Sequence, residues 1–330
     1  MDKDAVSQAQ AECWAISDGA AGNERQVLAL AERLDVAIRV WRIRPRVPWS
    51  WLAPRLTVAA RYSMSPLTQE QFRSPWPALA IGCGRDAALY TRCLRRWSAG
   101  RTYTVQILDP RISPAHFDLV IAPRHDRLSG ANVLTPTGSL NPVDDAWLEQ
   151  AAVAWSELAS LPAPRTAVLI GASRGKLQID EAWSHALFDA LSARHARDGG
   201  SFMVTTSRRT PAPLIETLRR GFAQFPGRFW SDASDGSNPY AGFLAQAQAI
   251  VVTPDSVNML SEACAVGVPV YTLLQKPLTS KLALLHRALM DGGHLRLLDQ
   301  SIGEEAAPVT ALRETAAIGA EVLRRWRERG

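Results

Sequence analysis

The residues best suited to chemistry lie on one predicted helix in the last third of the sequence. The apolar run at residues 249–252 predicts a strand, which leads into a polar turn ending with Asp255 and Ser256. Either residue can cap a helix, whose N-terminal N–H groups and dipole attract phosphate. Asn258 and Glu262 lie four residues apart on one face of that helix. A carboxylate such as Glu262 can accept both hydroxyls of a ribose, so the segment indicates a nucleotide site. The alternative is a surface stripe behind an ordinary cap.

A second candidate is the loop at residues 171–176, which follows the first predicted strand of the second half. Gly171 and Ser173 are small enough for the backbone to approach a phosphate, and Arg174 or Lys176 can neutralise it. The glycine spacing differs from that of a Walker loop. A plain tight turn is the competing interpretation.

A third candidate is Ser207-Arg208-Arg209, which follows the next predicted strand. The carboxyl ends of parallel strands meet at one sheet edge, so these side chains are expected near the first two candidates. Arginine suits bidentate contact with phosphate, and we favour Arg208 for this role. The alternative is that both arginines are only solvated.

Short apolar runs alternate with helical patterns along the whole chain, which is typical of parallel sheets covered by helices. The strands predicted in the first half are residues 13–17, 38–43, 78–81, 105–109, 119–122 and 133–135. Those predicted in the second half are residues 167–170, 202–205, 228–230, 250–253 and 270–274. We therefore predict an α/β fold of two doubly wound, Rossmann-like domains facing across a cleft, which is the expected site.

The domain boundary is predicted near residue 160. A helical pattern at residues 144–158 precedes the proline-punctuated residues 161–164, a combination typical of a linker. The predicted domains are residues 1–158 and residues 159–305, followed by a C-terminal helix within residues 306–330 that packs back on the first domain.

Composition limits the class of protein. With 330 residues and 47% hydrophobic content the chain can build two cores, and no apolar run approaches the roughly 20 residues of a membrane-spanning helix. Residues 1–10 lack the apolar stretch of a secretory signal, so we expect a cytoplasmic protein. The net charge of +5 is compatible with nucleic acid, an anionic membrane surface or a phosphorylated substrate. Four widely spaced cysteines predict buried free thiols: Cys13, Cys83, Cys93 and Cys264.

The segment at residues 256–269 resembles the donor site of glycosyltransferase B enzymes, especially the peptidoglycan and lipid A transferases. In these enzymes a strand and a polar turn precede a helix with a serine at its start, a later glutamate and a final Gly-x-Pro, here Ser256, Glu262, Gly267 and Pro269. The resemblance implies that Glu262 holds the ribose. It also implies that Thr253, Asp255 and the residues from Ser256 to Met259, Asn258 included, approach the diphosphate.

A broader resemblance covers nearly the whole chain. The sequence is similar to bacterial relatives of the plant mitochondrial-fission "elongated mitochondria" family, which is predicted to be glycosyltransferase-like. The residues that carry it are SDGAAGN at 17–23, IGCGR at 81–85, QILDPR at 106–111, TTSRRTP at 205–211 and TPDSVNM at 253–259. The family name describes a plant phenotype rather than a reaction.

In glycosyltransferase B enzymes the loop after the first strand faces the reaction centre, and here it contains Asp18, Gly19, Gly22 and Asn23. Related transferases often have a histidine where this chain has Asn23, and an amide cannot take a proton at neutral pH. Asp18 is our candidate base, because desolvation can raise the pKa of a carboxylate in a cleft. The alternative is that Asp18 caps the following helix or stabilises the loop.

His125 and Asp109 are the reserve candidates for catalysis, since both follow strands of the same sheet. A lone histidine is more often structural, and Asp109 has the alternative of orienting its own loop. The chain has no DxD motif of the metal-dependent transferases, so no metal or other cofactor is expected. Cationic side chains and a helix N-terminus can stabilise the departing diphosphate instead.

Residues 39–62 combine arginine with aromatic side chains. The members are Arg39, Arg42, Arg44, Arg46, Arg55, Arg61, Trp41, Trp49, Trp51 and Tyr62. Such a segment can form an interfacial patch on an anionic membrane, which suits a lipid-linked acceptor. Alternatively the tryptophans belong to the core and the arginines are solvated, because Pro45, Pro48 and Pro54 prevent one continuous amphipathic helix.

Together these features predict a metal-independent, inverting glycosyltransferase. Its second domain would bind a nucleotide-sugar, with UDP favoured, and its first would face the hydroxyl of a lipid-linked or cell-envelope acceptor. We expect it in the cytoplasm, peripheral to the inner face of the membrane, with no nucleic acid as partner. The alternatives are a non-catalytic binding or scaffold protein with this fold and a nucleotide-sugar 2-epimerase.

Overall fold

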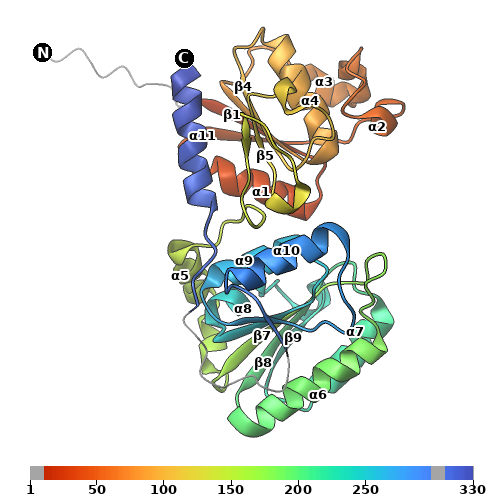
Figure 1. Ribbon diagram of the computed structural model, residues 1–330, viewed down its shortest axis with the longest axis vertical. Coiled ribbons are helices and arrows are strands. Elements are labelled where there is room, and N and C mark those ends of the chain that lie inside the picture. The colour runs from red at the N-terminus through yellow and green to blue at the C-terminus, as the bar shows by residue number, and fades with distance from the viewer. Residues whose placement is uncertain (1–10, 299–308, 330) are drawn as a thin grey trace, which may run out of the picture. The chain divides into compact units, whose positions relative to one another are not determined.

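The computed structural model describes residues 11–298 and 309–329, which form two compact units (Figure 1). The first unit comprises the described residues up to Pro142 together with those from Glu314 onward, and the second comprises those from Val143 to Arg313. Within the described residues, no helix is both long and apolar enough to cross a membrane. All four cysteines are buried and free, as expected.

The first unit is built on a parallel six-stranded sheet in the order β2-β1-β3-β4-β5-β6. Its strands are β1 (Glu12–Ser17), β2 (Ala37–Arg42), β3 (Leu79–Cys83), β4 (Tyr103–Ile107), β5 (Leu119–Ile121) and β6 (Val133–Leu134). Its helices are α1 (Ala21–Ala31), α2 (Trp49–Leu52), α3 (Pro66–Gln71), α4 (Gly84–Trp97) and α11 (Thr315–Arg329). Short 3-10 turns are η1 (Ala60–Ser63), η2 (Pro114–His116) and η3 (Arg124–Asp126).

Helices cover both faces of this sheet. On one face α1 and α11 pack over the strands, where Val322 of α11 joins Val27 and Leu30 of α1 in one apolar cluster (Figure 1). On the other face α4 and the segment after β2 surround a buried aromatic group that includes Trp14 and Phe72. The C-terminal helix is therefore part of the first unit.

The second unit has a parallel six-stranded sheet in the order β12-β11-β10-β7-β8-β9. Its strands are β7 (Arg165–Ile170), β8 (Ser201–Thr206), β9 (Gly227–Trp230), β10 (Ala249–Val252), β11 (Val270–Thr272) and β12 (Arg296–Leu297). Its helices are α5 (Asp145–Ala154), α6 (Glu181–Asp198), α7 (Ala212–Phe222), α8 (Tyr240–Gln246), α9 (Val257–Val266) and α10 (Ser280–Asp291). The 3-10 turns are η4 (Ser156–Ser160) and η5 (Ala233–Asp235).

This sheet is also covered on both faces. Helices α6 and α7 lie on one side, where Trp183 and Leu218 are buried, and α8, α9 and α10 lie on the other, where Phe243 and Leu260 are buried (Figure 1). The chain passes from β7 outward to β8 and β9, then returns to the other side of β7 as β10. β7 and β10 therefore form the switch point of this sheet, the position at which open parallel sheets bind their ligands.

The predicted strands all have counterparts in these sheets, and only the two-residue β12 has none among the predictions. The boundary differs: the units divide between Pro142 and Val143, not near residue 160, and again between Arg313 and Glu314. The predicted limit between residues 305 and 306 lies outside the described residues. Trp147 and Leu148 of α5 pack into the core of the second unit, so the helix taken for a linker belongs to that unit.

Candidate functional site

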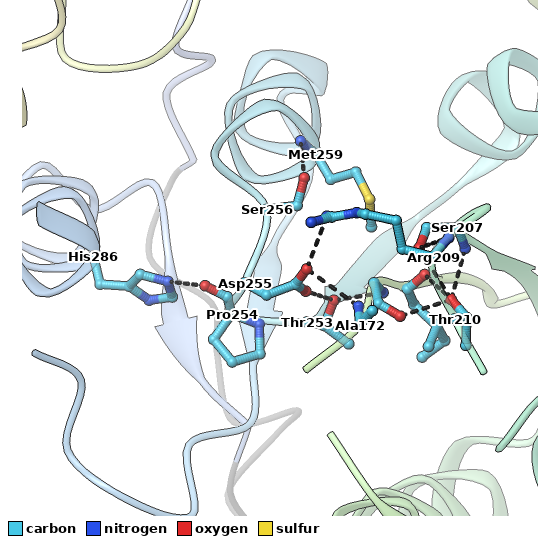
Figure 2. Close-up of polar contacts among 12 residues, drawn as sticks. Ala172, Ser207, Arg209, Thr210, Thr253, Pro254, Asp255, Ser256, Met259 and His286 are labelled. Atoms are coloured by element: carbon cyan, nitrogen blue, oxygen red, sulfur yellow. Dashed lines mark hydrogen bonds and ion pairs between the residues drawn. The ribbon is translucent and has the colours of Figure 1, made fainter. Parts of the chain in front are cut away.

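The loops at the switch point of the second sheet are tied together by hydrogen bonds (Figure 2). After β7, the Gly171 N–H donates to Thr253 Oγ1 at 2.8 Å and the Ala172 N–H donates to Asp255 Oδ2 at 3.2 Å. Thr253 Oγ1 in turn donates to Asp255 Oδ1 at 2.7 Å. From the sequence, the backbone of residues 171–176 was expected to approach a phosphate. The N–H groups of Gly171 and Ala172 already donate to side chains of the protein.

Asp255 is the centre of this arrangement and is fully buried, with 0% of its surface exposed. Burial raises the pKa of the Asp255 carboxyl, an effect opposed by the hydrogen bonds from Thr253 and Ala172 and by the charge of Arg209. The Arg209 guanidinium lies with Nη2 at 3.3 Å from Asp255 Oδ2, while 57% of the Arg209 side chain is exposed. A cation therefore stands at the surface directly over a buried acid.

The turn after β8 fixes this arginine. The Ser207 N–H donates to Thr210 Oγ1 at 3.0 Å, and Thr210 Oγ1 donates to the Gly171 carbonyl at 2.7 Å. The Arg209 N–H donates to Ser207 Oγ at 3.3 Å. The turn directs Arg209 to the switch point and leaves Arg208 exposed, so the structure brings Arg209 rather than the favoured Arg208 to Asp255.

The rest of the loop after β7 is a tight turn. Arg174 and Leu177 exchange two backbone hydrogen bonds, of 2.9 and 3.0 Å. Ser173 Oγ accepts the Ile179 N–H at 2.8 Å, which fixes the return of the chain toward α6. The side chains of Arg174 and Lys176 are exposed. The plain turn fits the backbone, and Arg174 and Lys176 are the exposed cations of this loop.

Helix α9 starts beside the same loops. Ser256 is its N-cap, with Oγ accepting the Met259 N–H at 3.4 Å, and Gly267 ends the helix in the left-handed region at φ +94°. Asn258 lies in the first turn and is half-buried. The positive end of the α9 dipole is therefore at the switch point, as the sequence predicted for a phosphate contact.

Glu262 is less accessible than a ribose ligand is expected to be. It is 2% exposed, and the Tyr240 hydroxyl of α8 donates to its Oε2 at 2.6 Å. A ribose hydroxyl that binds this carboxylate must displace the Tyr240 hydroxyl or share the carboxylate with it. The role of Glu262 as a ribose ligand therefore stays a prediction. In this structure the carboxylate accepts a hydrogen bond from Tyr240 of α8 instead.

His286 of α10 contacts the turn before α9 on the side away from Arg209 (Figure 2). Its Nε2 lies 2.9 Å from the Pro254 carbonyl oxygen, and the residue is 3% exposed. Burial lowers the pKa of His286, and the bond to the carbonyl opposes that shift. Burial therefore favours the neutral ring, and because a carbonyl oxygen only accepts, Nε2 is the donor to Pro254.

In the first unit the corresponding switch point lies between β1 and β3. Asp18 Oδ1 accepts the Ala20 N–H at 2.9 Å and the Asn23 side-chain amide at 3.1 Å. Asn23 Oδ1 lies 3.7 Å from the Cys83 thiol at the end of β3. Asp18 thus stabilises its own loop, which is the alternative weighed against catalysis, and Asn23 links that loop to the next strand. Gly19 in this loop has φ +78°, and Gly22 lies in the first turn of α1.

Asp86, in the first turn of α4, is an acidic residue that sequence reasoning missed. Burial raises the pKa of its carboxyl, and the negative charge of Asp18 adds to the rise, while Arg85 opposes it. Its partner in an ion pair is Arg85, with Nε at 3.4 Å from Oδ1. The signal available in the sequence was an acid three residues after a strand end.

The two reserve candidates are positioned by their own turns. Asp109 Oδ1 accepts the Arg111 N–H at 2.8 Å, which matches the loop-orienting alternative. His125 is buried in the short turn η3 after β5. Across residues 11–298 and 309–329, no group of three or more His, Cys, Asp or Glu side chains is placed to hold a metal ion.

The family model described as mitochondrial fission ELM1 matches residues 21–326. The chain belongs to the mitochondrial fission ELM1 family. Mitochondrial fission protein ELM1 of Arabidopsis thaliana is 32% identical over 255 residues, which cover 70% of this chain and 59% of the plant protein. The chain therefore spans less than two thirds of that relative. An uncharacterized protein of Rickettsia prowazekii is 25% identical over 297 residues, which cover 78% of this chain and 82% of that protein.

Solved structures show which fold this family member shares. A UDP-GlcNAc 2-epimerase from Methanocaldococcus jannaschii has a TM-score of 0.59 at 12% identity, covering 95% of this chain and 99% of its own. The glycotransferase of kitacinnamycin has a TM-score of 0.51 at 12% identity, covering 97% and 96%. At such identities the likeness shows the fold alone: two Rossmann-like domains of the glycosyltransferase B class.

Two further contacts of the candidate site were not predicted from the sequence. Arg209 adjoins the favoured Arg208, and only the hydrogen-bonded turn through Thr210 decides which of the two reaches Asp255. Tyr240 lies 22 residues before Glu262, and no spacing rule joins residues on two different helices. Both contacts depend on tertiary structure.

Proposed function

We propose that this ELM1 family member binds a nucleoside diphosphate sugar at the carboxyl edge of its second sheet and transfers the sugar to a hydroxyl group. A UDP-sugar is the favoured donor. In the proposed reaction the acceptor oxygen attacks the anomeric carbon from the face opposite the diphosphate. The bond between that carbon and the diphosphate breaks, the configuration inverts, and the acceptor proton passes to a base.

The observation that carries the proposal is Arg209 over Asp255 at the switch point. Arg209 is exposed and already oriented, while the acid beneath it is fully buried with a raised pKa. A diphosphate arriving from solvent would meet the guanidinium before the carboxylate. Exposed Arg174, Lys176 and Arg208 can add further positive charge, and the start of α9 contributes its dipole.

The nucleoside would lie along α9, with Glu262 as the ribose ligand. This requires the Tyr240 hydroxyl to release Glu262 Oε2 or to share it with a ribose hydroxyl. A carboxylate has about four acceptor sites, so one donor from tyrosine leaves capacity for a second. The proposal therefore expects Tyr240 to affect affinity for the ribose part of the donor.

For the base we propose Asp86 beside Asp18. A carboxylate that removes a proton from a hydroxyl works best when its pKa approaches the working pH. Burial and the neighbouring Asp18 raise the pKa of Asp86, whereas Asp18 itself accepts hydrogen bonds from Ala20 and Asn23. In the proposed reaction Asp18 only stabilises its loop and raises the pKa of Asp86.

A second candidate function is nucleotide-sugar binding without transfer. It is favoured by the loop-stabilising bonds of Asp18 and by Asn23, which stands where related transferases often have a histidine. The two functions make the same prediction for donor binding and differ in turnover. The acceptor would be a lipid-linked or cell-envelope hydroxyl, which the arginine and tryptophan content of residues 39–62 supports.

The test is calorimetric titration of the full chain with UDP, UDP-GlcNAc, GDP and AMP. We expect saturable binding of a nucleoside diphosphate or its sugar and a loss of about tenfold or more in Arg209→Gln, since one charge-assisted contact is worth about 1.5–3 kcal/mol. Arg220→Gln, on the exposed side of α7, is the matched control. Equal affinities in the two variants, or no binding of any nucleoside diphosphate, would end the proposal. Asp86→Asn should keep donor affinity and lose release of the free nucleotide from the sugar donor.

A further inference from the structure

Exposed large apolar side chains are concentrated in one short stretch of the first unit. Six of them lie between residues 47 and 67: Val47, Trp51, Leu52, Val58, Tyr62 and Leu67. The most exposed are Trp51 at 73%, Val58 at 74% and Tyr62 at 69%. In the rest of the described chain such exposure is limited to Val40, Val153 and Leu297. Grouped exposure of this kind marks an interaction surface, whereas single apolar residues do not.

Buried side chains of the same stretch pack into the core of the first unit. Trp41, Ala60 and Met64 are buried with Trp14 and Phe72 in one apolar cluster. The alternative in which the tryptophans belong to the core thus holds for Trp41 but not for Trp51. The exposed side chains therefore project from a packed base.

Hydrogen bonds fix the turns that carry the exposed side chains. The Trp49 indole N–H donates to the Val58 carbonyl at 2.9 Å. From α4, Arg85 Nη2 donates to the Ser50 carbonyl at 2.9 Å and Arg92 Nη1 donates to the Pro54 carbonyl at 3.0 Å. The prolines break the stretch into α2, η1 and α3, and these bonds hold the pieces in one arrangement.

Charge separates this stretch from the rest of the protein. Residues 39–67 contain six arginines and no Asp, Glu or Lys, so they carry +6. The whole chain carries +5, which leaves −1 for all other residues together. All six arginines are exposed, and Arg42 is paired with Glu24 through two hydrogen bonds of 2.7 and 2.6 Å. Arg39 lies over the Trp41 ring, Arg44 donates to the Asp18 carbonyl at 2.7 Å and Arg55 donates to the Arg111 carbonyl at 3.3 Å.

We propose that the exposed face of residues 39–67 docks on an anionic lipid bilayer. Trp51, Leu52 and Val58 would enter the interfacial region, where aromatic and aliphatic side chains are both stabilised, and Arg46 and Arg55 would bind lipid phosphates. A second copy of the chain is a poorer occupant, because it would bring two surfaces of +6 together. Nucleic acid would use the arginines and leave the aliphatic side chains unexplained.

The docking extends the proposed function by placing the chain where a lipid-linked acceptor lies, yet it does not rest on sugar transfer. Vesicle binding is measured without any nucleotide, and donor binding is measured without any lipid. Each proposal can therefore fail while the other stands.

The experiment is co-sedimentation of the full chain with vesicles of phosphatidylglycerol and phosphatidylcholine, compared with vesicles of phosphatidylcholine alone. We expect binding to the anionic vesicles that weakens as salt is raised. The double variant Trp51→Ser/Val58→Ser should bind roughly tenfold to a hundredfold less tightly, and Arg46→Gln about fivefold less. All three side chains are exposed, so folding should be unaffected.

Val153→Ser and Arg287→Gln are the matched controls, since both residues are exposed on the second unit. The proposal is overturned if the controls weaken binding as much as the test variants, or if phosphatidylcholine binds equally well. Release from vesicles by inorganic phosphate at constant ionic strength would instead assign the arginines to a free phosphate. A dimer that Trp51→Ser/Val58→Ser converts to a monomer would assign the surface to a second copy.

Discussion

The hydrogen bonds that join the loop after β7 to Thr253 and Asp255 require a glycine at position 171. Replacing Gly171 by alanine should therefore lower the stability of the second unit. A Cβ at this position would overlap the Asp255 carboxylate, whose Oδ1, Oδ2 and Cγ are its three nearest neighbours. That carboxylate is fully buried and is bonded to the Thr253 hydroxyl and the Ala172 N–H. It has no solvent to move into, so the added methyl group must displace it.

Displacing the carboxylate breaks two hydrogen bonds to a charged acceptor, each worth about 1.5–3 kcal/mol. Because the turn can relax, we take the lower end of the summed energies of the two hydrogen bonds. Gly171→Ala should therefore lower the free energy of unfolding of the second unit by about 3 kcal/mol. For a unit of this size the loss corresponds to a fall in Tm of roughly 6–12 °C. That is a large fraction of the stability of an ordinary domain.

Amide hydrogen exchange in β7 and β10 measures the free energy of opening for this unit alone, without assuming that both units unfold together. Gly175→Ala is the matched control in the same loop. Gly175 has φ +59° and an added Cβ there meets no atom within 4 Å, so only left-handed backbone strain of about 1 kcal/mol is expected.

The double variant Gly171→Ala/Asp255→Ala completes the test, because without the carboxylate the new methyl group has no such overlap. The cost of Gly171→Ala should then fall by at least half relative to its cost in the wild-type chain. The reasoning is refuted if that cost is unchanged, or if Gly171→Ala is no more destabilising than Gly175→Ala.

Three further predictions concern single contacts. Tyr240→Phe removes a hydrogen-bond donor from buried Glu262 and should destabilise the second unit by about 1–3 kcal/mol. In urea denaturation, the double variant Tyr240→Phe/Glu262→Gln should recover most of that loss. Burial lowers the pKa of His286 from its ordinary 6.5, so stability is complete above that pH and is lost as the pH falls toward the folded pKa. His286→Gln, which keeps a donor for the Pro254 carbonyl, should flatten the loss in melting curves from about pH 7 to about pH 5. Val322→Ala should lower the free energy of unfolding of the first unit by about 2 kcal/mol and speed amide hydrogen exchange in α1. Faster exchange confined to the second unit would contradict the packing of α11 in the first.

The strands could be predicted because parallel, doubly covered strands are short apolar runs with polar ends. Residues 249–252 and residues 167–170 are such runs, and both are buried strands. The edge strand β12 has only two residues, too few to show a pattern. The boundary was misplaced because the prolines at residues 162 and 164 mark a turn before β7, whereas the units divide at Pro142.

The candidate site was predictable as far as local sequence determines it. The cap at Ser256 and the left-handed Gly267 follow from residue type at the two ends of one helix. The inward turn of Asp255 does not, because its hydrogen-bond donor Ala172 lies in the loop after β7, more than 80 residues earlier. A sequence pattern places residues at a sheet edge, but only packing decides which of them point outward.

The two units share a design at their switch points that bears on how a ligand would bind. In the second unit the side chains of Thr253 and Asp255 tie down the loop after β7, and in the first Asn23 links Asp18 to the end of β3. Both sheet edges are thus ordered by internal polar contacts before any ligand arrives. Ordering a loop on binding would cost about 1–2 kcal/mol per residue in conformational entropy, so edges that are already fixed leave more of the contact energy for affinity. The specificity of the second unit must then come from the side chains beyond the closed loops, which is why Arg209 is the decisive residue to test.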